Sequence, residues 1–60
     1  MAGYRLYFLN EAGHIVDAAD ALHDTDNEAV AWAERQCAGC DLELWSGARV
    51  VAKIPRRQHA

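Results

Sequence analysis

The sequence predicts an α+β fold in which two β-hairpins form a four-stranded antiparallel sheet with one helix packed on one face, in the order β-β-α-β-β. Three observations lead to this prediction: an aromatic and apolar run at residues 4–9, a complete helix signature at residues 25–39, and an alternating pattern at residues 41–54. Sixty residues allow a single core, so residues 1–55 are expected to form one domain. Residues 56–60 are expected to be a frayed basic tail.

The first segment, "YRLYFL", predicts a strand with two apolar faces. Tyr4, Leu6 and Phe8 point to one face, and Tyr7 and Leu9 point to the other. Strands of this kind are usually central in a sheet and covered on both sides.

The following "NEAG" predicts a type I turn with Gly13 in the left-handed conformation of a G1 bulge. The chain then returns as a second strand, "HIVDA". This hairpin is expected to pair Leu9 with Ile15 and Phe8 with Val16. The next residues, through Asp20 and Asp24, are interpreted as a polar, acidic connection containing His23.

The segment "TDNEAVAWAERQCAG" carries the start and stop signals of a helix. Thr25 at the N-cap and Glu28 three residues later form a capping box. Gly39 is expected to end the helix in a left-handed conformation. The predicted inner stripe consists of small and apolar residues: Ala29, Val30, Ala33 and Cys37.

The last segment, "CDLELWSGARVVAKI", predicts two strands joined by a three-residue loop at the Ser-Gly turn. That loop length gives each face a consistent character. The apolar face would hold Leu42, Leu44, Val50, Ala52 and Ile54. The other face would hold Asp41, Glu43, Arg49, Val51 and Lys53. Pro55 ends the last strand.

The order "YRLYFL", then "GHI", an Ala-rich helix and "ELW-x-G-x-R-x-V-A" resembles short bacterial proteins of about this length whose function is not assigned. The resemblance covers nearly the whole chain. It implies a stand-alone β-β-α-β-β domain, and it supplies no catalytic residues. The "CAGC" pair is not part of the shared pattern.

Cys37 and Cys40 have the C-x-x-C spacing of redox and zinc sites. Redox sites place this pair at the start of a helix, where the dipole stabilises a thiolate, whereas here it lies at the C-terminal end of the predicted helix, where the partial charge is negative. Zinc is a second alternative, but a structural site needs four ligands, and His14, His23 and His59 are scattered. We therefore predict packing roles for both cysteines and expect neither a metal nor a cofactor.

An enzyme is not predicted, because no Ser-His-Asp order, phosphate-binding glycine loop or catalytic carboxylate pair is recognisable. The second sheet face, by contrast, is expected to leave an apolar and aromatic patch open, as protein interfaces do. The predicted interface residues are Tyr4, Tyr7, Leu9, Trp45 and Val51. The leading functional prediction is a non-enzymatic homo-oligomeric interaction module, with a homodimer as the expected assembly.

A nucleic-acid-binding module is the alternative, with sheet aromatics stacking on bases. The residues expected to meet phosphate are Arg5, Arg49, Lys53, Arg56 and Arg57. The net charge of −3 and the absence of a basic stripe count against it. A signal peptide or membrane span is not expected, so the predicted location is cytoplasmic.

Overall fold

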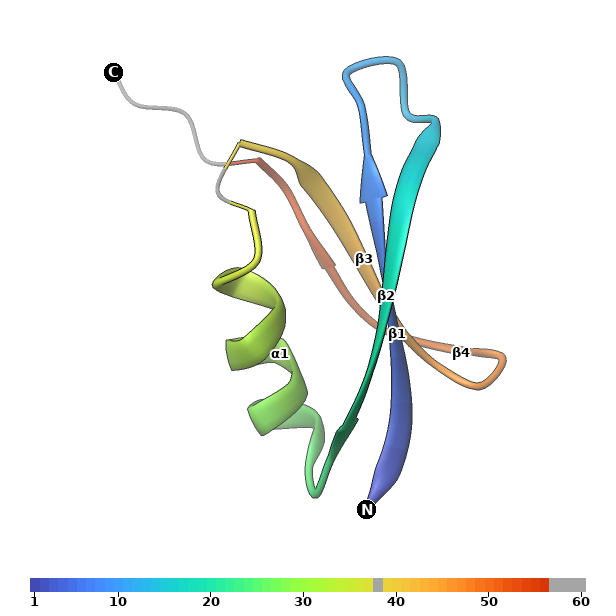
Figure 1. Cartoon of the computed structure of the whole chain (residues 1–60), viewed down its shortest axis with the longest axis vertical. Helices are drawn as coiled ribbons and strands as arrows, with labels where there is room; N and C mark the ends of the chain where they lie inside the picture. Colours follow the sequence, from blue (N-terminus) through green and yellow to red (C-terminus); the bar gives the residue numbers. More distant parts are fainter. Residues whose placement is uncertain (38, 57–60) are drawn as a thin grey trace.

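The computed structural model describes residues 1–37 and 39–56. Its elements are β1 (Ala2–Leu9), β2 (Ile15–His23), α1 (Asp26–Glu34), β3 (Asp41–Ser46) and β4 (Arg49–Ile54). The four strands form one antiparallel sheet in the order β2-β1-β3-β4. In Figure 1, α1 lies along one face of the sheet. The predicted fold class and element order are therefore confirmed.

The core lies between α1 and the two central strands. Leu6 pairs with Leu44 across β1 and β3, and both side chains are fully buried. Ala29 and Ala33 of α1 are also fully buried, and their small side chains allow the helix to approach the sheet closely. Burying each Leu contributes roughly 2 kcal/mol to the free energy of unfolding. Ala29 and Ala33 of the predicted helix stripe thus belong to the core, and β1 contributes the face that carries Tyr4 and Leu6.

The first turn has the predicted conformation. The Gly13 N–H donates to the Asn10 carbonyl at 3.0 Å, the Asn10 N–H donates to His14, and Gly13 has φ +82°. The predicted Leu9–Ile15 pair is present. The predicted Phe8–Val16 pair is wrong, because the register shifts between Phe8 and Leu9, where Val16 is the extra residue of a β-bulge, and Phe8 pairs with Asp17 instead.

The second strand is longer than predicted. The residues interpreted as an acidic connection belong to β2, which continues to His23. Ala18, Ala19 and Asp20 have low strand propensity, but each pairs with a residue of β1. Backbone pairing with a central strand therefore outweighs local propensity here.

The predicted helix start is confirmed, and the predicted helix end is wrong. The Glu28 N–H donates to the Thr25 hydroxyl at 3.2 Å, and the Glu28 carboxylate accepts from the Asp24 N–H. Arg35 is the C-cap, so α1 reaches neither Cys37 nor Gly39. The Gln36 side-chain amide donates a hydrogen bond to the Trp32 carbonyl at 2.9 Å, which stabilises the helix end at Arg35.

Cys37 and Cys40 are joined by a disulfide, with their Cα atoms 5.6 Å apart. Both residues are partly buried and pack against the core, as the packing interpretation requires. Their place is the loop between α1 and β3 rather than the last turn of the helix. The disulfide closes this loop directly before β3 begins.

The second hairpin has a two-residue turn instead of the predicted three-residue loop. Ser46 pairs with Arg49, and Gly47 is the first turn residue, with φ +61°. Glycine is preferred there because positive φ is strained for other residues. A β-bulge beside Trp45 supplies the odd residue that the loop was expected to supply.

This bulge decides which face each residue of β4 occupies. The predicted partners Leu44–Ala52 and Leu42–Ile54 are present. Val50, however, pairs with Trp45 and is 40% exposed, so its predicted apolar-face position is wrong. Arg49 is also on the opposite side from the prediction, since it bonds to the helix residue Asp26.

Candidate interaction surface

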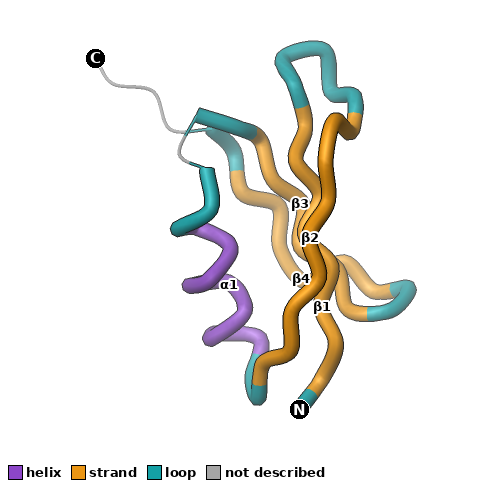
Figure 2. Tube along the Cα trace, viewed as in Figure 1, coloured by secondary structure: helices purple, strands orange, loops and turns teal. Residues whose placement is uncertain are grey.

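The sheet face opposite α1, called here the outer face, carries polar, aromatic and aliphatic side chains together. Its residues follow from the strand pairs: Gly3, Arg5, Tyr7 and Leu9 of β1, Ile15, Ala18, Asp20 and Leu22 of β2, Asp41, Glu43 and Trp45 of β3, and Val50 and Lys53 of β4. Figure 2 shows that no described helix covers this side, where only the β3–β4 turn projects. The outer face is therefore the larger open surface of the sheet.

An aromatic pair and an ion pair lie side by side on the outer face. The Tyr7 and Trp45 rings meet edge to face, with centroids 6.4 Å apart, and Trp45 Nε1 donates to the Glu43 carboxylate. Arg5 Nε donates to Asp20 Oδ1 at 2.7 Å across β1 and β2. This hydrogen bond lowers the pKa of Asp20 and raises the pKa of Arg5.

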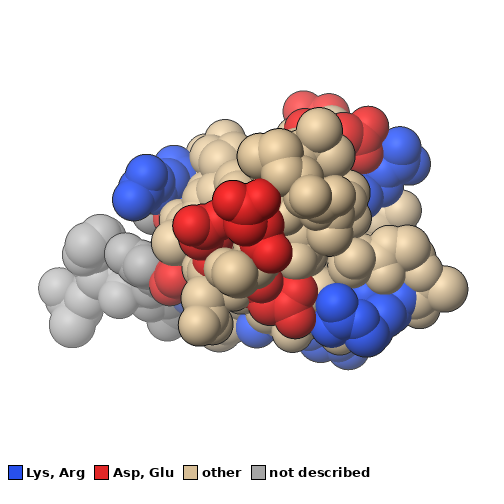
Figure 3. All heavy atoms as spheres, turned by 90° about the horizontal axis from the view of Figure 1, so that it is seen from below, with Lys and Arg blue, Asp and Glu red and all other residues tan. Residues whose placement is uncertain are grey.

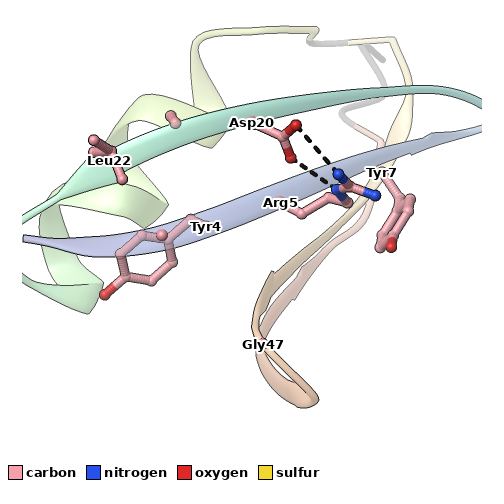
Figure 4. A pocket seen from close by; sticks show the side chains of 8 residues that line it. Tyr4, Arg5, Tyr7, Asp20, Leu22 and Gly47 are labelled. Carbon is pink, nitrogen blue, oxygen red and sulfur yellow. Dashed lines mark hydrogen bonds and ion pairs between the residues drawn. The ribbon is translucent and has the colours of Figure 1, made fainter.

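A hollow of about 500 Å³ lies between this ion pair and the projecting β3–β4 turn. Figure 4 shows Arg5 and Asp20 reaching toward each other, with Gly47 at the tip of the turn. The lining residues are Gly3, Tyr4, Arg5, Tyr7, Asp20, Ala21, Leu22 and Gly47. The hollow is open to solvent, and its charged groups already bond to each other.

The predicted interface residues do not all lie on this surface. Tyr7, Leu9 and Trp45 belong to the outer face and are partly buried. Tyr4 is on the helix side and only 4% exposed, so its inclusion was wrong. Val51 sits at the β4 bulge and packs against the core cluster.

Among the large apolar side chains of the four strands, the most exposed belong to β2, where no interface was predicted. Ile15, Val16 and Leu22 are 57%, 62% and 63% exposed. Leu22 was missed because the residues after Ala18 were predicted to form a polar connection rather than a strand. The available signal was Leu22, an apolar residue within a segment assigned to a solvent-exposed loop.

The outward edge of β2 is unpaired within the described part of the chain, since β2 bonds only to β1. In Figure 2, β2 passes in front of β1, and no described helix or loop crosses it. An unpaired edge presents backbone N–H and C=O groups that can bond to another strand. We call this edge, with the side chains of Ile15–His23, the β2 edge.

A polar cluster joins β1, α1 and β4 at the other side of the sheet. The Tyr4 hydroxyl donates to Asp26 Oδ1 at 2.6 Å, and Arg49 bonds to the same carboxylate at 3.3 Å. The Tyr4 hydrogen bond, with a further contribution from Arg49, lowers the pKa of Asp26. Figure 3 views the end where α1 begins and shows acidic side chains gathered there.

Three of the five basic residues of the predicted phosphate-binding set bond to carboxylates. Arg5 bonds to Asp20, and Arg49 bonds to Asp26. Arg56 donates its backbone N–H to Asp41 and reaches both Asp41 and Glu11 with its side chain, although it was predicted to fray. The backbone of Lys53 lies opposite that of Glu43 in the register of the second hairpin. Arg57 lies outside the described residues.

The candidate metal ligands are not gathered at one place. His14 follows the first turn, whereas His23 ends β2 with its ring 5.2 Å from the Trp32 ring. His59 lies outside the described residues, within which no group of three possible ligands is found. The two cysteine sulfurs are bonded to each other, whereas zinc binds thiolates.

No family model, curated protein or solved structure matches this chain. The resemblance to short bacterial proteins therefore stays a prediction. Helices able to cross a bilayer are absent from the described part of the chain, whose one helix has nine residues.

Proposed function

We propose that this chain is a non-enzymatic interaction module that associates with a second copy of itself. The observation that carries the proposal is the position of the exposed apolar side chains. Of the five large apolar residues that are exposed in the described part of the chain, three belong to β2: Ile15, Val16 and Leu22. Exposed apolar side chains beside an unpaired strand edge are typical of surfaces that bind another chain.

The small size of the core supports the same proposal. The fully buried large side chains are Leu6, Leu42 and Leu44. A domain of about 60 residues buries only about 60% of the surface exposed by its unfolded chain. Association with a second copy would add buried apolar surface, and it would raise stability in a concentration-dependent way.

Nucleic-acid binding has weaker support. Arginines contact phosphate through free guanidinium donors, and counterion release depends on their charge. Arg5, Arg49 and Arg56 each have a carboxylate partner within 3.5 Å. Breaking these pairs would oppose binding, so we do not propose nucleic acid as the partner.

The proposal is tested by sedimentation equilibrium of the oxidised protein at micromolar concentrations. The expected result is a mass that rises with concentration from 6.7 kDa toward twice that value. A constant mass of 6.7 kDa across the micromolar range would contradict the proposal.

A further inference from the structure

We propose that β2 pairs antiparallel with β2 of a second copy, about a two-fold axis that passes beside Ala19. The two four-stranded sheets would then form one continuous eight-stranded sheet. This inference rests on the proposed function, and it specifies the surface and the register of the association.

The composition of the two sheet edges favours β2 as the contact. Natural edge strands are commonly protected by Lys, Pro or short length. β4 has six residues, includes Arg49 and Lys53, and is followed by Pro55. β2 has nine residues, and it contains no Lys, Arg or Pro. Its bulge at Val16 is close to one end, so seven residues with regular pairing remain available, from Asp17 to His23.

The alternation of side chains limits the possible registers. A continuous sheet keeps both helices on one side, so a residue must oppose a residue of the same parity. Asp17, Ala19 and Ala21 pair with residues of the helix side, while Ala18, Asp20 and Leu22 belong to the outer face. Val16 is the unpaired residue of the bulge, and Ile15 beyond it pairs with Leu9 of the outer face.

The register centred on Ala19 is self-complementary. It pairs residues 17–21 of the two copies with one another, because Ala19 is the middle residue of this regularly paired stretch. It brings the bulge residue Val16 level with Leu22 of the second copy, and this approach occurs twice by symmetry. The two apolar side chains that are 62% and 63% exposed would then cover each other. The remaining pairs set each Asp against Ala: Asp17 against Ala21, and Asp20 against Ala18.

The neighbouring registers of the same parity are less favourable. Centring the axis on Ala18 would place Val16 opposite the Asp20 carboxylate. Centring it on Asp20 would place two carboxylates directly opposite each other, which is destabilising. In the Ala19 register, each Asp20 keeps its ion pair with Arg5 of its own chain, at 2.7 Å.

A back-to-back dimer through the outer face is less favourable for a different reason. Arg5 and Asp20 lie on this face with side chains that are 54% and 69% exposed. Stacking two outer faces would remove both charged groups from water, at a cost that their mutual attraction need not offset. Edge pairing leaves them in solvent.

The register is tested by a charge exchange between the two predicted partners. Val16→Lys and Leu22→Glu are each expected to raise the dimer dissociation constant about tenfold or more, since each removes two apolar cross-strand pairs. The double variant, Val16→Lys with Leu22→Glu, is expected to restore association in low salt. Positions 16 and 22 are about 20 Å apart along one strand, so a restoration can arise only between chains.

Val50→Lys on β4 is the matched control, and its dissociation constant should equal that of the wild type. Circular dichroism of each variant verifies that the fold is kept. If the wild type associates but the double variant stays as weak as the single variants, the Ala19 register is wrong and the proposed function stands. If Tyr7→Ser weakens association more than Val16→Lys, the outer face is the contact instead. A wild type that stays monomeric would overturn both proposals.

Discussion

The two edge strands of the sheet, β2 and β4, differ in their contacts with the rest of the chain. β4 is tied to α1 by the contact between Arg49 and Asp26, and the chain after it is tied to β3 by Arg56 and Asp41. β2 is bonded along its length only to β1, and His23 at its end contacts the Trp32 ring of α1. Arg49 and Arg56 thus bond to carboxylates of the same chain, while the β2 edge, which has no Lys or Arg, exposes apolar side chains.

Reduction of the Cys37–Cys40 disulfide is expected to have the largest effect, by lowering the free energy of unfolding. The Cys37–Cys40 bond restricts the loop that leads into β3, and loop-closure entropy predicts a stabilisation of about 2 kcal/mol for such a short loop. Urea unfolding of the wild type with and without reductant measures this difference. Association through β2 should not change.

The matched control for that experiment is Cys37→Ala with Cys40→Ala, whose unfolding midpoint should not respond to reductant. An equal response of this variant would show that the reductant acts elsewhere. Reduction of the wild type should leave association intact at a concentration where the monomer remains folded. Loss of association under these conditions would show that the disulfide also affects pairing through β2.

Removing the carboxylate shared by α1 and β4 is expected to have the next largest effect. Asp26→Asn takes the charge from the acceptor of Tyr4 and Arg49, so the melting temperature at pH 7 should fall by several degrees. Asp20→Asn removes only the exposed ion pair with Arg5 on β2, and its effect should be smaller.

The pH dependence distinguishes a charge effect from a packing effect at Asp26. Its pKa in the folded protein is lowered from 3.8, so its contribution to stability is complete above that value. The contribution is lost as the pH falls through the lower, folded-state pKa. Melting temperatures of wild type and Asp26→Asn should therefore converge in acid. A difference that persists in strong acid would contradict the charge explanation.

Local signals in the sequence were sufficient for much of the fold. The N-cap at Thr25 and the left-handed turn residue Gly13 each depend on a few adjacent residues, and both are confirmed. The inner faces of β1 and β3 follow from simple alternation, which places Leu6 and Leu44 in the core.

The predictions failed where pairing between distant residues decides the structure. β2 continues past Ala18 because β1 supplies backbone partners, which its Ala- and Asp-rich composition does not reveal. The bulges beside Leu9 and Trp45 each insert one residue, and one residue changes which face follows. Because β2 was predicted too short, its unpaired edge and the exposed Leu22 were not recognised as part of the candidate surface.

Amide hydrogen exchange at two protein concentrations tests the central claim most directly, because it observes both edges at once. We predict that the outward-facing amides of β2 exchange more slowly as the concentration is raised through the dissociation constant, while the outward-facing amides of β4 keep the same rates. Protection that grows on β4 instead, or β2 rates that stay constant while the mass doubles, would contradict pairing through the β2 edge.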